Sequence, residues 1–243
     1  MNAQPPMRAI RAFAHRGGSL EAPENSLAAF QRAARLGYTE LETDVRGTSD
    51  GVAVIHHDAT LDRTTDRAGR VSQMTWNQIR GARIHGREPI LRLEDALEAL
   101  PEARFTIDVK DAPSVPALID VLRRIGSPDR ITVGSFSHRR LEQVRRHLQV
   151  TTSASPREVL AVAWSRRPPR IPARFLQVPP RIGRRSLLTP AFMARAQAMG
   201  CEVHVWTLDD EASITAALDA GAHGIMTDRP LVLREILRRR GQW

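Results

Sequence analysis

Several short apolar segments of this sequence end in side chains that can carry acid–base, metal or anion chemistry. Histidine titrates near neutral pH, carboxylates bind divalent cations, and lysine and arginine bind anions. Residues two positions apart on a strand share a face, so such pairs point in one direction. The segment ends carry His15-Arg16, Glu42 with Asp44, His57-Asp58, Asp108 with Lys110, and His204 with Trp206. Five such ends indicate a common site.

Lys110 also stands out by composition. The chain has 36 lysine and arginine residues, and Lys110 is the single lysine among them. An ammonium group is a compact point charge, whereas a guanidinium group is a wide planar fork. In a sequence this poor in lysine, we expect Lys110 to do chemistry that arginine cannot do; the alternative is a leftover surface lysine. It closes the run FTIDVK and shares a strand face with Asp108.

Glu42, Asp44 and Asp108 predict a site for a hard divalent cation, Mg²⁺ or Ca²⁺, because carboxylate oxygens are the ligands such ions prefer. The alternative for Glu42 and Asp44 is an inward ion pair with arginine. Burying both carboxylates requires a positive charge nearby in either case. A metal ion together with Lys110 and Arg16 would make the site cationic overall, which favours an anionic substrate such as a phosphate ester.

His15 and His57 are candidates for a general acid–base pair, because imidazole exchanges protons near working pH. His56 would point to the opposite face of its strand from His57. We assign His56 an ordinary structural or surface role, and leave His204 open. The other histidines given the ordinary role are His85, His138, His147 and His223.

The bulk composition excludes several classes of protein. The 243 residues carry a formal net charge of +9, but no aromatic–basic interleaving or zinc-finger spacing accompanies it, so nucleic-acid binding is not expected. The single cysteine excludes an internal disulfide and favours a reducing, cytoplasmic location. No run is apolar enough for a secretion signal or a membrane span.

Apolar, β-branched runs alternate with helix-like runs along the chain. Strands are expected near residues 10–14, 40–45, 52–56, 104–110, 131–135, 150–153, 174–178, 202–207 and 223–227. Helices are expected near residues 25–36, 93–99, 114–125, 138–147, 156–163, 190–199, 210–219 and 230–239. Asn25 or Ser26 is expected to cap the first helix. The segment RGTSDG is too short for a parallel crossover, so 52–56 is expected to pair antiparallel with 40–45.

The other eight strands, alternating with helices, predict an α/β fold, a TIM (β/α)₈ barrel. In such a barrel the site lies at the carboxyl ends of the strands, which is where the polar pairs stand. Residues 46–92 would then be a small insertion after strand two of a single domain over residues 1–243. The alternative is an open doubly wound sheet, but no G-x-G-x-x-G motif follows the first strand.

An ordered set of motifs spans nearly the whole chain. The motifs are HRG (15–17), PENS (23–26), ELETDV (40–45), HHDATLDRTT (56–65), LEDAL (93–97), IDVK (107–110), SF (135–136), VWT (205–207) and HGIMTDRP (223–230). In content and order this set resembles the glycerophosphodiester phosphodiesterase family. The resemblance implies a TIM barrel with a small insertion after strand two, in agreement with the strand count.

The resemblance also implies a role for each site residue. The implied roles are acid–base catalysis by His15 and His57, metal binding by Glu42, Asp44 and Asp108, phosphate binding by Arg16 and Lys110, support of the first loop by Asn25, and lining of the glycerol or head-group side by Phe136 and Trp206. Asp108 departs from the family pattern, which usually has glutamate there; the shorter side chain is expected to alter metal affinity or ion preference. PENS for PENT keeps the hydroxyl, and Arg92 replaces the usual threonine before LEDAL.

The activity implied by the resemblance is metal-dependent hydrolysis of glycerophosphodiesters to glycerol 3-phosphate and an alcohol. One alternative is a lysophospholipase D, which needs an apolar groove at the mouth of the barrel. Its walls are expected from the residues near Trp164, Phe175 and Phe192. The arginine-rich loop 179–185 is expected to steer anionic substrates or make weak contact with an anionic membrane. Another alternative is an inactive barrel used for binding. The head group, the ion and the oligomeric state stay open.

Overall fold

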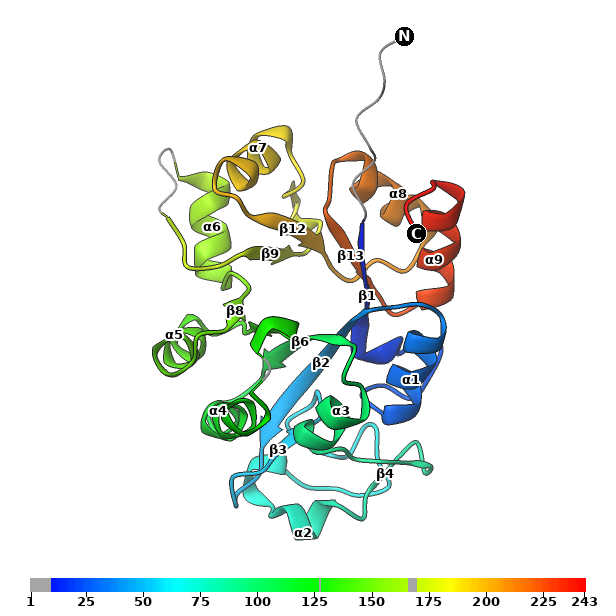
Figure 1. Cartoon of the computed structure of the whole chain (residues 1–243), viewed down its shortest axis with the longest axis vertical. Coiled ribbons are helices and arrows are strands. Elements are labelled where there is room, and N and C mark those ends of the chain that lie inside the picture. The colour runs from blue at the N-terminus through cyan, green and yellow to red at the C-terminus, as the bar shows by residue number, and fades with distance from the viewer. Residues whose placement is uncertain (1–9, 127, 166–169) are drawn as a thin grey trace.

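Eight parallel strands form a nearly closed barrel in the computed structural model, which describes residues 10–126, 128–165 and 170–243. Their order in the sheet is β8-β7-β6-β2-β1-β13-β12-β9, and a single parallel bridge between Ser153 and Phe175 joins its two ends. The strands are β1 (Arg11–Ala14), β2 (Glu40–Gly47), β6 (Arg104–Val109), β7 (Ile131–Gly134), β8 (Thr151–Thr152), β9 (Phe175–Val178), β12 (Glu202–Val205) and β13 (Gly224–Thr227). The predicted barrel is therefore confirmed (Figure 1).

Helices lie around the outside of the barrel (Figure 1). They are α1 (Leu27–Arg35), α3 (Leu93–Ala99), α4 (Ser114–Ile125), α5 (His138–His147), α6 (Pro156–Trp164), α7 (Pro190–Ala198), α8 (Glu211–Asp219) and α9 (Pro230–Arg239). All eight predicted helices are present within a few residues of their expected ends. Ser26 caps α1, because its hydroxyl accepts a hydrogen bond from the Ala29 N–H at 3.1 Å. Within the described residues, no helix has the length and apolar character needed to cross a membrane.

The segment between β2 and α3 folds back on β2 and carries a small core of its own. As predicted, β3 (Ala53–Ile55) pairs antiparallel with β2, with Ile55 opposite Val45. It is followed by η2 (Val71–Gln73), α2 (Trp76–Ile79), β4 (Arg83–Ile84) and β5 (Glu88–Pro89). Their buried apolar side chains are Val54, Leu61, Val71, Ile79, Ala82, Ile84 and Ile90. We propose that this insertion belongs to one domain with the barrel, because the strand that opens it is paired to the barrel sheet.

The barrel strands separate an outer apolar core from an inner layered one. Outward residues such as Leu41, Ile107 and Val203 join the large core between strands and helices. The opposite face of the same strands points into the barrel, because strand side chains alternate. Near the amino-terminal end of the strands, Arg11 forms ion pairs with Glu40 and Glu202. These ion pairs provide the charge compensation that carboxylates inside a barrel need.

An aromatic layer lies inside the barrel. The ring of His204 lies 4.8 Å from that of Phe13 and 4.7 Å from that of Phe175, measured between centroids. His204 is fully buried, and burial lowers the pKa of its imidazole, so the neutral ring suits this layer. The role of His204, left open from sequence, is therefore barrel packing. Gly224 completes the layer, because a Cβ there would lie 2.9 Å from atoms of both Phe13 and His204.

Gly224→Ala is expected to destabilise the fold by about 1–3 kcal/mol, because the added methyl group overpacks this layer. Urea unfolding measures the loss. Gly81→Ala is the matched control, since the atoms that its Cβ would meet belong to the end of the Arg67 side chain, which can move. Equal stability of the two variants would contradict close packing of the aromatic layer.

Candidate active site

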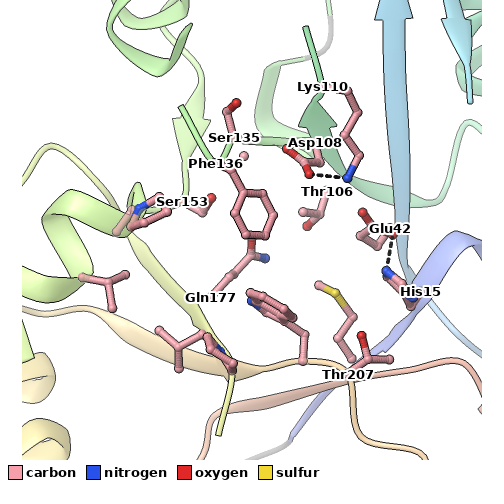
Figure 2. A pocket seen from close by; sticks show the side chains of 18 of the residues that line it. His15, Glu42, Thr106, Asp108, Lys110, Ser135, Phe136, Ser153, Gln177 and Thr207 are labelled. Carbon is pink, nitrogen blue, oxygen red and sulfur yellow. Dashed lines mark hydrogen bonds and ion pairs between the residues drawn. The ribbon is translucent and has the colours of Figure 1, made fainter. Parts of the chain in front are cut away.

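A cavity of about 510 Å³ opens at the carboxyl ends of the barrel strands. Eight of the ten site residues predicted from the sequence line it: His15, Arg16, Glu42, His57, Asp108, Lys110, Phe136 and Trp206. Figure 2 shows His15, Glu42, Asp108 and Lys110 converging on one side of this cavity. Asp44 and Asn25, the other two predicted residues, are buried and belong to the layer behind that side. The structure thus brings together residues from β1, β2, the insertion and β6.

The turn after β1 places His15 and Arg16 at the cavity. The residues His15–Gly17 form a short 3₁₀ turn, and Gly17 has a φ of +81°. A Cβ at Gly17 would lie 2.6 Å from Ala29 Cβ, so only glycine allows the turn to pack this closely on α1. The turn is also tied to β2, because the backbone N–H of Arg16 donates a hydrogen bond to Glu42 Oε2 at 3.1 Å.

Asn25 supports the carboxylate behind the cavity. Its Nδ2 donates a hydrogen bond to Asp44 Oδ2 at 2.9 Å, and its Oδ1 accepts one from Thr43 Oγ1 at 2.9 Å. Asn25 adopts a φ of +58°, a conformation that asparagine tolerates better than most residues. The loop that follows β1 is therefore fastened to β2 at Asn25 as well as at Arg16.

A carboxylate holds each of the two predicted catalytic histidines through its Nδ1 atom. His15 Nδ1 lies 2.7 Å from Asp228 Oδ1, and His57 Nδ1 lies 2.6 Å from Asp58 Oδ1. Such a contact selects the tautomer in which Nδ1 carries the proton and leaves Nε2 for chemistry. His15 Nε2 faces Glu42, 3.7 Å from its Oε2 (Figure 2).

Asp228 is a site residue to which the sequence interpretation gave no role. It lies just beyond β13, and its carboxylate also accepts a hydrogen bond from Ser19 Oγ at 2.5 Å. Burial alone would lower the pKa of His15, but the Glu42 carboxylate and the hydrogen bond to Asp228 outweigh it and raise that pKa. The signal that could have found Asp228 is its place at the carboxyl end of the last barrel strand.

Lys110 and Arg16 neutralise the buried carboxylate of Asp44. Lys110 Nζ lies 2.8 Å from Asp44 Oδ1 and 2.7 Å from Asp108 Oδ2, and Arg16 Nε lies 3.1 Å from Asp44 Oδ2. Burial would raise the pKa of Asp44, yet the two cations lower it to about 2. The pKa of Lys110 is raised in turn, because Asp44 and Asp108 outweigh the effect of burial. Asp44 and Lys110 are thus both charged at neutral pH.

The predicted metal ligands do not form a preassembled cluster. In the part of the chain that the structure describes, no group of three or more histidine, cysteine or acidic side chains is arranged to hold a metal ion. The ammonium of Lys110 lies between Asp44 and Asp108 instead. Two features nevertheless fit an additional cation. Asp108 Oδ1 is buried without a hydrogen-bond partner among the described residues, and burial and the charge of Asp44 raise the pKa of Glu42 to about 7.

Arg63, in the insertion, connects the loops that carry the two histidines. Its guanidinium binds both oxygens of Glu24 at 2.8 Å and reaches Asp58 Oδ2 at 2.5 Å. The same Glu24 accepts a hydrogen bond from Arg16 Nη1 at 3.2 Å. The hydrogen bond from Arg63 is the largest influence on Asp58 and lowers its pKa, so this carboxylate stays ionised beside His57.

The other side of the cavity is apolar. Its wall consists of Phe136, Pro156, Val159, Leu160, Val178, Pro179, Ile182 and Trp206. The rings of Phe136 and Trp206 meet edge to face, 5.7 Å apart. Ile182 comes from a hairpin of β10 (Arg181–Ile182) and β11 (Arg185–Ser186).

The predicted apolar groove was expected from residues near Trp164, Phe175 and Phe192. None of these three aromatic residues lines the cavity, although Leu160 and Val178, close to the first two in sequence, do. Phe175 lies in the aromatic layer inside the barrel, and Phe192 is buried between helix and sheet. Trp164 is half exposed at the end of α6 and does not line the cavity. The strand and helix patterns identified apolar residues correctly but could not tell how far each lies from the mouth of the barrel.

Comparisons with known proteins agree with this geometry. The model of the glycerophosphoryl diester phosphodiesterase family matches residues 15–232. Probable glycerophosphodiester phosphodiesterase 2 of Mycobacterium tuberculosis is 37% identical, over 96% of this chain and 92% of its own length. Human lysophospholipase D GDPD1 is 26% identical, over 93% of this chain and 85% of its own.

The fold also has close structural counterparts. An Oleispira antarctica phosphodiesterase, solved in complex with the product sn-glycerol-3-phosphate, superposes with a TM-score of 0.82 at 23% identity. The match covers 95% of this chain and 97% of that one, and at this identity it shows the fold alone. The family match and the 37% identity across nearly the whole chain establish that this protein belongs to the glycerophosphoryl diester phosphodiesterase family.

Proposed function

We propose that this protein hydrolyses glycerophosphodiesters to sn-glycerol 3-phosphate and an alcohol. The observation that carries the proposal is the pair of imidazoles, His15 and His57, each held at Nδ1 by its own carboxylate in one cavity. Two oriented imidazoles are what an acid–base displacement at phosphorus needs. The names of the M. tuberculosis relative and of the product complex from O. antarctica support the same substrate class.

The reaction exchanges one phosphorus–oxygen bond for another. One histidine takes the proton from the attacking oxygen as that oxygen bonds to phosphorus. If the attacking oxygen belongs to water, glycerol 3-phosphate forms directly. If it belongs to a neighbouring hydroxyl of the substrate, a cyclic phosphate forms first, and water then opens the ring in a second displacement with the two histidines in exchanged roles. The other histidine gives a proton to the alcohol oxygen as its bond to phosphorus breaks. Lys110 and Arg16 bind the phosphate and stabilise the negative charge that builds up on its oxygens.

A divalent cation, Mg²⁺ or Ca²⁺, is part of this proposal. Glu42, Asp44 and Asp108 would hold it, since all three offer oxygen ligands and two of them show unmet demand for positive charge. When bound, such an ion supplies Lewis-acid stabilisation to the phosphate oxygens. Release of Lys110 from Asp44 and Asp108 would then free its ammonium for the substrate.

Lysophospholipids are a second candidate substrate class, favoured by the apolar wall. Phe136, Leu160 and Ile182 are 62%, 42% and 37% exposed and lie together in the wall of one cavity. Exposed apolar residues that are grouped in this way mark a binding surface. An acyl chain passing over them would cover that surface.

The hairpin that carries Ile182 also exposes Arg181 and Arg185, which we propose make weak contact with anionic lipid head groups. The inactive-barrel alternative has no support from family membership or from the oriented histidines.

His15→Ala and His57→Ala should each lower kcat for glycerophosphocholine by about 10²–10⁴, the contribution of one acid–base group. The measurement is steady-state turnover with Mg²⁺ or Ca²⁺ at saturation. His147→Ala on the exposed end of α5 is the control and should keep normal turnover. Near-wild-type turnover of either cavity variant would show that its histidine is not an acid–base catalyst.

Asp228→Asn should lower kcat by about 10- to 100-fold, part of the contribution of an acid–base group, because His15 loses its orientation. Asp228 helps to raise the pKa of His15, so its neutralisation lowers that pKa and moves the corresponding limb of the pH–rate profile to lower pH. Asp120→Asn, at an exposed position on α4, is the control and should change neither kcat nor the position of this limb. A loss of turnover without displacement of the limb would mean that Asp228 acts only on the fold.

Ile182→Asp should lower kcat/KM for lysophosphatidylcholine about tenfold more than for glycerophosphocholine, because a charge replaces apolar contact area. Leu231→Asp, at an equally exposed position on α9, is the control. If the wild-type protein does not cleave lysophosphatidylcholine, the second candidate substrate class is wrong.

Co-sedimentation with anionic vesicles at low salt tests the contact between the hairpin and lipid head groups. If the protein does not sediment with the vesicles, the proposed contact is excluded.

A further inference from the structure

A neutral polar floor lies between the charged and apolar sides of the cavity. It is formed by Thr106 of β6, Ser153 after β8, and Gln177 of β9, all of which line the cavity. Figure 2 shows Gln177 extending into the cavity, on the side of Phe136 and across from Asp108 and Lys110.

Gln177 has a hydrogen-bond donor that the protein does not use. Its Nε2 is buried and has no partner among the described residues. The position of Gln177 on β9 explains why its Nε2 has no partner. Phe175 and Gln177 share the inward face of β9, and Phe175 belongs to the aromatic layer with His204 and Phe13. Phe175 thus lies in the aromatic layer, whereas Gln177, two residues further along the same face, lines the cavity. Since a buried amide N–H without an acceptor is unfavourable, a ligand atom is the natural partner.

The floor also has the shape and charge to receive a small hydroxylated group. A Cβ at Gly134 would lie 3.0 Å from Ser153 Oγ and 3.8 Å from Gln177 Oε1, so the glycine keeps this part of the cavity open. Hydroxyl and amide groups can both donate hydrogen bonds to a neutral hydroxyl and accept hydrogen bonds from it. The apolar wall offers neither donors nor acceptors. The part of the substrate that fits here carries hydroxyl groups and no charge.

We propose that Gln177 donates a hydrogen bond from Nε2 to a hydroxyl of the substrate's glycerol group and thereby determines specificity for glycerol-bearing diesters. The inference rests on the proposed function. It identifies the Gln177 amide as the protein group that distinguishes glycerol from other alcohols. It places glycerol on the neutral floor and the variable alcohol along the apolar wall, which is open to solvent. Gln177 is a specificity residue and takes no part in proton transfer.

The test uses two substrates that differ only in hydroxyl groups, glyceryl p-nitrophenyl phosphate and n-propyl p-nitrophenyl phosphate. The ratio of their kcat/KM values measures recognition of the glycerol hydroxyls. Gln177→Met keeps the length of the side chain and removes the donor. It should lower this ratio about tenfold, the loss expected for one or two hydrogen bonds. Gln197→Met, on the exposed face of α7, is the control and should keep the wild-type ratio.

Product binding provides a second measurement. Gln177→Met should raise the inhibition constant of sn-glycerol 3-phosphate about tenfold while changing that of inorganic phosphate far less. A thermal melt checks that the variant is folded. An unchanged ratio and unchanged inhibition, or equal losses on both substrates, would overturn the assignment of Gln177. Failure of the wild-type protein to cleave any glycerol-bearing diester would instead overturn the proposed function, and the inference with it.

Discussion

Charge balance around the buried carboxylate of Asp44 is the constraint on which the rest of the site depends. Asp44 is fully buried against Lys110 Nζ and Arg16 Nε. Removing one partner of a buried ion pair typically costs about 3–5 kcal/mol, because the other charge stays buried without compensation. The sheet register satisfies this constraint: Asp44 of β2 lies opposite Asp108 of β6, and Lys110 follows two residues later on the same face.

The same geometry gives a physical reason for the single lysine. One nitrogen atom of Lys110 contacts carboxylates on two strands, at 2.8 and 2.7 Å. A planar guanidinium presents its donors as a fork and would spread over a wider area. The ammonium is also the group that can exchange carboxylate partners for phosphate oxygens without a change of shape. A composition dominated by arginine thus keeps lysine at a position where a point charge is required.

The insertion matters to the site because it supplies His57 and holds it to the first loop. Arg63 joins Glu24, beside Arg16, to Asp58, beside His57. The apolar cluster of the insertion gives this arm a support separate from the barrel core. Inside the barrel, the aromatic layer of Phe13, Phe175 and His204 forms the base above which the cavity opens. The packed aromatic layer supports the cavity from inside the barrel, and Arg63 links the two loops at its mouth. Together these features can hold the two histidines in fixed orientations.

Much of this arrangement could be predicted from local patterns. The alternation of apolar and polar residues along β2 and β6 identified the inward carboxylates and Lys110, because strand side chains alternate in any context. The short RGTSDG segment predicted the antiparallel β3, and the count of remaining strands predicted the barrel. Local patterns could not predict how far along the barrel axis each inward side chain lies. Phe175 and Gln177 share one face of β9, yet one lies in the aromatic layer and the other at the cavity floor.

The sequence by itself therefore determined which residues face inward and which chemical groups gather at the strand ends. The tertiary structure decided which of those groups become partners. His15 meets Asp228 across 213 residues of chain, and Lys110 lies between two carboxylates that were expected to share a metal. The apolar wall combines α6 and the β10–β11 hairpin with Phe136 and Trp206 and does not include Phe175 or Phe192. Alternation follows from backbone geometry within a segment, whereas depth and partnership follow from the tilt and register of strands far apart in sequence.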